Sequence, residues 1–540
     1  MTKLNKFISS GEHWVWFNAG AVALSLFMVI GLISLIAYRG MGHFWPSAIS
    51  TYTYLKDGET IRRHGQLYEE QLPKGSKSDS AKQYLIKTAN RDIYGLDFNW
   101  IAQSDIVSIE SDDSVYLIVR REWGDFYGYV DEVSRGGLLI TDKNSIDKAL
   151  VEITTRAEQL VEEINNIEKN QIANINFEIE SLRLRKRKSE LDYRYPVDTS
   201  ELTAKEEQLR KDYQQLELRL LALYREAERD WIKVSTVDGQ VVMINAASVV
   251  KFYQPNNMSL LEKLSLFFSN IVEFVSDNPR EANTEGGVYP AIFGTVTMVL
   301  LMSIMVTPFG VIAAVYLHEY AKQGVITRFI RIAVNNLAGV PSIVYGVFGL
   351  GFFVYFLGGN IDSLFYPEAK PAPTFGTSGL LWASLTLALL TLPVVIISTE
   401  EGLSRIPKSI REGSMALGAT KIETLWRTVL PMASPAMMTG LILAIARAAG
   451  EVAPLMLVGV VKLAPNLPID ANEPFLHLDR KFMHLGFHIY DVGFQSPNIE
   501  AARPLVYATA LLLVLVIISL NISAIKIRNK LREKYKALEN

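Results

Sequence analysis

Six long stretches almost free of charge constrain the fold of this chain more than any other feature. A bilayer core is about 30 Å thick and is crossed by roughly 20 apolar helical residues, whose main-chain groups must bond to one another. The sequence therefore predicts six transmembrane helices, over residues 14–38, 288–317, 332–357, 379–399, 433–461 and 504–525. The first is longer than a signal-peptide core and lacks a small-residue cleavage site, so we expect a permanent anchor.

Charge and cysteine content exclude several classes of function. The 54 basic and 57 acidic residues give a net charge of −3, which supplies no bulk field for holding nucleic acid, so we expect no nucleic-acid partner. The chain has 0 cysteines. Disulfides, iron–sulfur clusters, thiolate zinc sites and cysteine nucleophiles are therefore excluded.

Basic residues predict the orientation of the spans in a bacterial inner (cytoplasmic) membrane, because Lys- and Arg-rich loops stay in the cytoplasm. They gather before the first span, between spans two and three, between spans four and five, and after the last span. We therefore expect both termini in the cytoplasm, with residues 1–40 forming the cytoplasmic N-terminus and first span, and 531–540 a cytoplasmic tail. Residues 41–285 are then periplasmic. Four basic residues between the fifth and sixth spans, Lys462, Arg480, Lys481 and Arg503, oppose this orientation weakly.

The periplasmic segment predicts an α+β domain with an inserted helical hairpin. β-branched and aromatic runs predict strands at 84–87, 105–110 and 114–122, and again within 231–253. Heptad-like spacing between them predicts an antiparallel hairpin at about 145–230, broken near Tyr195–Asp198. The hairpin either docks a partner or acts as a passive spacer. Its basic run 182–190 is either a solvated helix face or an anion-attracting cluster.

A patterned loop at 400–431 separates spans four and five. Glu412, Gly413 and Ser414 are followed by Gly418 and, further on, by Leu430-Pro431. This spacing resembles the EAA loop of ABC-importer permeases, with Gly413 and Ser414 in place of two alanines. We expect a short coupling helix over 409–417, a turn at Gly418 and a new span starting at Pro431.

The resemblance implies that this coupling element contacts a separate ATPase. No P-loop pattern occurs in the sequence, so ATP and Mg²⁺ are expected on partner subunits and not on this chain, which binds no cofactor itself and is not an enzyme. Arg411, next to the motif, either contacts the ATPase or a released anion, or is an ordinary membrane-flanking arginine.

Two segments narrow the family further. Residues 330–354 and 442–459, together with LGATK at 417–421 and LGFHIYDVGFQSP at 485–497, resemble the PstA permeases of phosphate-specific ABC transporters. The resemblance implies an all-α, MetI-like type I importer core of five helices at 286–530 that joins the first span. It implies a second permease subunit (PstC-type), a dimer of ATP-binding subunits (PstB-type) and a periplasmic phosphate-binding protein (PstS-type), with membrane lipid around them.

Arg447 and Glu451 are the charged residues inside the predicted spans, four positions apart and so expected on one helical face. A charge near the bilayer centre costs about 3 kcal/mol or more. We expect Arg447 to meet a passing oxyanion and Glu451 to position it; the alternative is a structural salt bridge. Asn335, Asn336 and Ser342 either line the path or pack helices together.

Two other functions stay open. The chain could be a permease for another oxyanion, such as sulfate or molybdate, or a membrane-anchored sensor or scaffold in which the hairpin is the active part. His477, His484 and His488 lie in the last external loop, but Leu485 stands where a zinc protease would carry its general base, so no metal site is expected.

Overall fold

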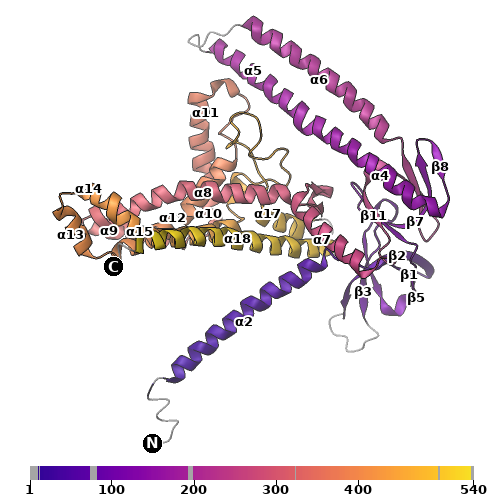
Figure 1. Ribbon diagram of the computed structural model, residues 1–540, viewed down its shortest axis with the longest axis horizontal. Helices are drawn as coiled ribbons and strands as arrows, with labels where there is room; N and C mark the ends of the chain where they lie inside the picture. The colour runs from indigo at the N-terminus through magenta and orange to yellow at the C-terminus, as the bar shows by residue number, and fades with distance from the viewer. Residues whose placement is uncertain are drawn as a thin grey trace, which may run out of the picture.

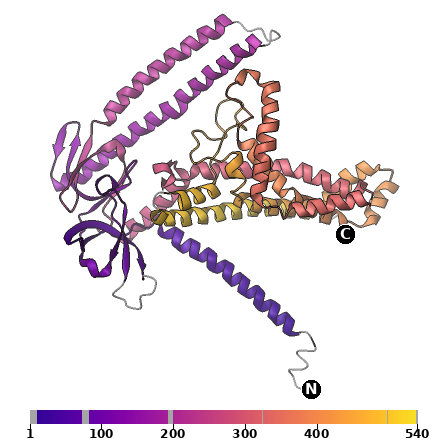
Figure 2. The ribbon, with the colours of Figure 1, turned by 180° about the vertical axis from the view of Figure 1, so that it is seen from behind.

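The computed structural model describes residues 10, 12–72, 82–191, 199–322, 324–496 and 499–536. Within these residues the chain forms a helical bundle joined to a β-rich domain, from which a long helical hairpin projects (Figure 1). Figure 2 shows from behind that the hairpin leans back over one side of the bundle.

Six helices in the described residues are long and apolar enough to cross a membrane, as the sequence predicts. Three of these helices contain a π-helical stretch. The spans are α2 (Glu12–Gly42); α8 (Tyr289–Val315) with its extension Tyr316–Tyr320; α10 (Ser342–Phe348) running through Gly349–Gly358 into α11 (Gly359–Phe365); α12 (Leu380–Ser404); α14 (Lys421–Thr424) running through Leu425–Val429 into α15 (Leu430–Gly450); and α18 (Ile499–Lys536).

The predicted start of the third span at residue 332 is wrong. Residues Val325–Leu337 form a separate helix, α9, and the span begins only at Ser342. Pro341 has no N–H to donate and disfavours a helical conformation in the residue before it, so the chain is interrupted between the two helices.

The predicted limits of the fifth span, 433–461, are also wrong. The helix already begins at Lys421, and Pro431 lies inside it just after the π-helical stretch Leu425–Val429. It ends at Gly450, because Glu451 takes an extended conformation with φ −82° and ψ 127°. Arg447 therefore belongs to the helix, whereas Glu451 belongs to the segment that follows it.

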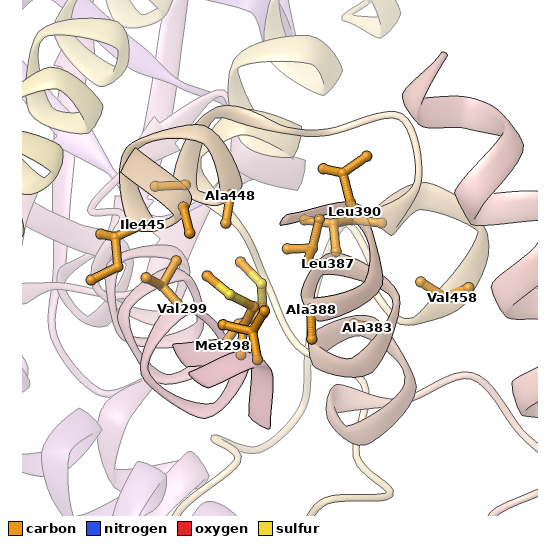
Figure 3. Packing of buried hydrophobic residues seen from close by; sticks show 14 of the residues in the cluster. Met298, Val299, Ala383, Leu387, Ala388, Leu390, Ile445, Ala448 and Val458 are labelled. Atoms are coloured by element: carbon orange, nitrogen blue, oxygen red, sulfur yellow. The ribbon is translucent and has the colours of Figure 1, made fainter. Parts of the chain in front are cut away.

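The core of the bundle lies where α8, α12 and α15 meet (Figure 3). Small side chains on α12 and α15 let the helices approach closely, which is the usual way that helices associate in lipid. Larger side chains of α8 fill the remaining space. The fully buried members include Met298, Val299, Ala383, Leu387, Ala444 and Ala448.

Helix α2 stands apart from the other spans. It meets α18 near its outer end, where Gly40 lies against the main chain of Tyr507, and then diverges (Figures 1 and 2). None of its apolar window is buried within the chain.

The β-rich domain, which we call the external domain after its predicted location, contains two larger antiparallel sheets and confirms the predicted strands. One has the order β4-β3-β2-β1-β5, and the other β10-β9-β7-β6-β11 with β8 beside β7. A two-stranded ribbon, β12 (Pro279–Arg280) with β13 (Glu285–Gly286), precedes α8. The larger sheets comprise β1 (Ser50–Lys56), β2 (Glu59–Gln71), β3 (Gln83–Lys87), β4 (Phe98–Ala102), β5 (Ile106–Ser111), β6 (Tyr116–Arg120), β7 (Asp125–Arg135), β8 (Leu138–Ile140), β9 (Trp231–Ser235), β10 (Val241–Asn245) and β11 (Val249–Tyr253).

The predicted helical hairpin is present. Its outgoing arm is α4 (Lys143–Asn166), which continues through a π-helical stretch into α5 (Ala173–Leu191), and its return arm is α6 (Thr199–Ala227). The predicted break at 195–198 lies outside the described residues. Buried side chains hold the arms together at two levels, Ile164, Ile167, Leu223 and Ala227 near the sheet and Leu182, Leu202 and Leu209 further out.

The hairpin touches two loops of the bundle. Lys188 of α5 lies 3.7 Å from the carboxylate of Glu368, and the neighbouring Arg187 donates to the main chain of Lys370. In the second loop, the side chain of Asn472 donates a hydrogen bond of 3.0 Å to Asn174 of α5. Part of the basic run 182–190 therefore faces this protein's own loops.

Four shorter helices complete the framework, α3 (Arg91–Tyr94), α13 (Lys408–Ala416), α16 (Leu455–Val458) and α17 (Leu485–Tyr490), together with α7 (Leu260–Ser276), which joins the external domain to α8.

Candidate functional site

Arg447 lies in the last turn of α15, and its guanidinium is only partly engaged. Its Nε lies 3.5 Å from Oε1 of Glu451, and the two side chains are 33% and 23% exposed. Among the described residues, no hydrogen bond or second ion pair occupies its terminal nitrogens. These N–H groups form a planar fork that suits an oxyanion.

Two interruptions of the helices lie next to elements of this site. One is the break at 338–341, and the other is the non-helical segment between Gly450 and Leu455. Gly346 lies so close to Pro454 that a Cβ on the glycine would come within 2.7 Å of the proline Cα. Irregular main chain at membrane depth is tolerated where it is buried in protein or lines a cavity, so this junction is the natural place for a polar path.

Tyr345 ties the first interruption to α15. Its hydroxyl donates to the main-chain oxygen of Leu337 at 2.7 Å, across the break, and its ring belongs to the same buried cluster as Ala444 and Ala448. The start of α10 and the end of α15 are thereby held together.

The three predicted polar residues lie on the elements that flank the break. Asn335 and Asn336 are exposed on the last turn of α9, outside the span in which they were expected, and Ser342 is the partly buried first residue of α10. Within the described residues, no hydrogen bond or ion pair joins any of them to Arg447.

The predicted coupling helix is present one residue earlier than expected, as α13. Glu412 and Gly413 are exposed on it, and Ser414 shares a hydrogen bond of 3.0 Å with Thr424 of α14. Gly418 has φ 92°, a conformation that side chains other than glycine rarely adopt, and it turns the chain from α13 toward α14.

Arg411 is not an exposed flanking residue. Its side chain is 18% exposed; Nη2 donates to the main-chain oxygen of Leu403 at 2.7 Å and lies 3.1 Å from Oε1 of Glu319, which is 10% exposed. Glu319 lies in the extension of α8 and Leu403 in the last turn of α12, so Arg411 fastens α13 to the ends of two spans.

Exposed apolar side chains surround the coupling helix, and sequence reasoning missed them. Leu417 is 92% exposed, Trp426 70%, Ile422 61% and Met415 44%; we call these four the coupling surface. Ile422 and Trp426 are four residues apart in one continuous helix and so share a face. That spacing could have been noticed had the span not been expected to begin at residue 433.

The three histidines between α16 and α18 have separate surroundings. His477 lies 2.9 Å from Oδ1 of Asp470, whereas Nδ1 of His484 accepts a hydrogen bond from the main chain of Gly486. Burial lowers the pKa of both His484 and His488 to about 4, so these rings are neutral near pH 7. Within the described residues, no group of three or more His, Asp or Glu side chains could hold a metal ion.

Comparison with known proteins places the bundle in a family. Residues 306–533 match the model of the binding-protein-dependent transport system inner membrane component. The probable ABC transporter permease YqgH of Bacillus subtilis is 32% identical over 203 residues, which are 37% of this chain and 62% of YqgH. The phosphate transport system permease PstA 1 of Mycobacterium tuberculosis is 34% identical over 244 residues, 45% of this chain and 71% of the relative.

The match spans about two thirds of these relatives' length, and the external segment precedes the residues that match the family model. A chain of the methionine ABC transporter MetNI, solved in inward-facing conformations, aligns at 18% identity with a TM-score of 0.33, over 45% of this chain and 94% of that chain. A score this low adds nothing to the family assignment.

Proposed function

Because this chain belongs to the family of binding-protein-dependent transport permeases that includes the phosphate permease PstA, we propose that it is the transmembrane permease subunit of an ATP-driven importer of inorganic phosphate. The observation that carries the proposal is the 34% identity to PstA 1 over 71% of that relative's length. As a permease component, this chain is a multi-pass membrane protein that is not itself catalytic.

Arg447 is the residue we assign to the substrate. Its unoccupied terminal N–H groups can donate two parallel hydrogen bonds to a phosphate oxygen pair, while Glu451 holds the other edge of the guanidinium. Asn335, Asn336 and Ser342 are secondary candidates, since they flank the interruption next to which Arg447 lies.

The coupling surface and α13 form the docking site for a pair of PstB-type ATPase subunits, which carry ATP and Mg²⁺. Four large apolar side chains exposed to water around a nine-residue helix form a patch of the kind that marks protein interaction sites. Arg411 then passes movement of α13 to α8 and α12 through its contacts with Glu319 and Leu403.

The remaining partners follow from the same assignment. A PstC-type permease supplies the other half of the path, and lipid together with that subunit covers the exposed surface of α2. A PstS-type binding protein delivers phosphate from the periplasm. The distribution of Lys and Arg supports cytoplasmic termini and a periplasmic external domain.

Uptake by cells tests the proposal against its rivals. Cells that lack this chain are starved of phosphate and complemented with the native chain, and uptake of labelled phosphate and labelled sulfate is measured in parallel. We expect restored uptake of phosphate alone. Restored sulfate uptake would assign the chain to another oxyanion, and restoration of neither would favour a sensor or scaffold.

A further inference from the structure

Helix α7 carries an apolar face that none of the described residues covers. The helix starts at a capping box, in which the Ser259 hydroxyl accepts from the main chain of Glu262 and the Glu262 carboxylate accepts from the main chain of Ser259. It therefore begins at a defined residue, and its 17 residues form a stable element between the external domain and α8.

The side chains of α7 fall into three groups. Phe267, Ile271 and Phe274 pack against the bundle in one cluster. Polar side chains, including Glu262, Ser269 and Glu273, occupy another side. The uncovered face comprises Leu260, Leu261, Leu264, Phe268, Val272 and Val275, which are 67%, 78%, 37%, 62%, 64% and 38% exposed; we call it the α7 apolar face.

The spacing shows that this face is continuous along the helix. Residues 260, 264, 268 and 272 recur every four positions and so line one side from the first turn to the last. Six large apolar side chains on one short helix are more than the single exposed residues that a protein surface ordinarily carries.

Two membrane spans fix where α7 lies. Asn270 donates to the main-chain oxygen of Phe44 at 2.9 Å, two residues after α2 ends, and the rings of Phe44 and Phe274 are 5.2 Å apart. The main-chain N–H of Val288, next to the start of α8, donates to Phe274 at 2.8 Å. The helix therefore meets the outer ends of both spans, and it lies crosswise to α2 (Figure 1).

A tryptophan side chain lies beside α7, close to the end of α2. Trp45 follows α2 closely, is 39% exposed and lies 6.0 Å from the ring of Phe267. Tryptophan is enriched where a membrane meets water, because its ring is apolar while its N–H is polar.

We propose that α7 lies in the outer boundary of the bilayer, with the α7 apolar face in lipid and its polar side in water. A helix that is tied to the ends of two spans, lies crosswise to one of them and is apolar on one side matches an interfacial amphipathic helix. The lipid that surrounds both spans extends to this helix without any further partner.

The location of α7 at the membrane boundary would also determine the position of the external domain. Lys251 of β11 bonds Glu273 at 2.7 Å and Asn270 at 2.6 Å, so α7 is linked directly to the sheet. The contact of α7 with lipid would therefore fix the height above the membrane of the part of the external domain that contains β11.

Lipid-borne quenching tests the proposal, and the absence of cysteine makes the labelling clean. Phe268→Cys and, as a second position, Val272→Cys are labelled with an environment-sensitive NBD dye in the full-length chain within its complex. The matched control is Ser269→Cys, exposed on the polar side of the same helix, where its hydroxyl bonds Glu273. The complexes are reconstituted in phosphatidylcholine–phosphatidylglycerol vesicles that contain lipids with a doxyl quencher near the headgroup or deep in the acyl chain.

We expect blue-shifted emission at 268 and 272 and stronger quenching by the shallow doxyl than by the deep one, because such helices sit about 5–10 Å into the boundary. The control position should show neither effect. Blue-shifted emission without lipid quenching would mean that another protein covers the face, and unshifted emission would place it in water; either result overturns the proposal. The readout does not depend on which solute the complex carries.

Discussion

Removing the Arg411 side chain should uncouple the ATPase from the spans. Arg411 and Glu319 are 18% and 10% exposed and lie 3.1 Å apart, and Arg411 also bonds the main chain of Leu403. Breaking a buried pair by deleting one partner costs about 3 kcal/mol, which is roughly a hundredfold change in an equilibrium constant. A shift of that size weakens the attachment of α13 to α8 and α12, so Arg411→Ala should lower phosphate uptake by about tenfold or more.

The assay compares uptake with assembly of the complex. Arg411→Ala should still copurify with the ATPase, because all four side chains of the coupling surface are retained. The control is Arg405→Ala in the same loop, whose partner Glu401 is 2.6 Å away but whose side chain, like that of Glu401, is mostly exposed, at 72% and 61%. Such surface pairs contribute about 0–1 kcal/mol, so uptake should be retained.

Exchanging the charges of Arg411 and Glu319 tests whether their contact can be restored. Glu319→Arg combined with Arg411→Glu restores opposite charges at the contact and should recover part of the uptake that either single change loses. Equal uptake by Arg411→Ala and Arg405→Ala would refute the argument that the Arg411 contact transmits motion.

Three further predictions follow from other parts of the chain. Arg447→Ala should be inserted in the membrane yet fail to support phosphate uptake, whereas Arg447→Lys keeps the charge but loses the planar fork and should retain only a fraction, both measured with labelled phosphate. Leu417→Asp should abolish copurification of the ATPase, because it places a carboxylate in the middle of the coupling surface; unchanged recovery would show that the surface is not the docking site. Burial, with the charge of Asp125, raises the pKa of Glu285 to about 7, so the folded domain binds a proton there that the unfolded chain releases at lower pH. Stability should therefore fall as pH rises from the ordinary carboxyl pKa toward about 7, and Glu285→Gln should remove that fall in thermal unfolding scans of the full chain.

Charge-free length predicts the spans well, but it does not find breaks in them. Ile330, Ile332 and Val334 of α9 are as apolar as the span that follows, so the predicted third span absorbed part of a separate helix. Pro341 was the available signal. At the fifth span the opposite error occurred, because the charges of Lys421 and Arg427 indicated a loop, whereas both residues lie in a helix that continues into α15.

Prediction from the sequence has the same limit at the candidate site. Spacing of four residues predicted that Arg447 and Glu451 meet, and they do, at 3.5 Å. It could not show that the helix ends between them or that Gly346 brings the second interruption alongside, since both depend on how distant segments pack. For Arg411, the partners Glu319 and Leu403 come from two other spans, which sequence spacing cannot reveal.

Transport by the purified complex tests the central assignment most directly. The complex is reconstituted in vesicles with ATP on the side of the ATPase subunits and with the periplasmic binding protein and labelled phosphate on the other side. We predict ATP-dependent accumulation of phosphate that excess unlabelled phosphate, but not sulfate, abolishes. Accumulation without ATP, or equal competition by sulfate, would contradict the assignment of this chain to an ATP-driven phosphate importer.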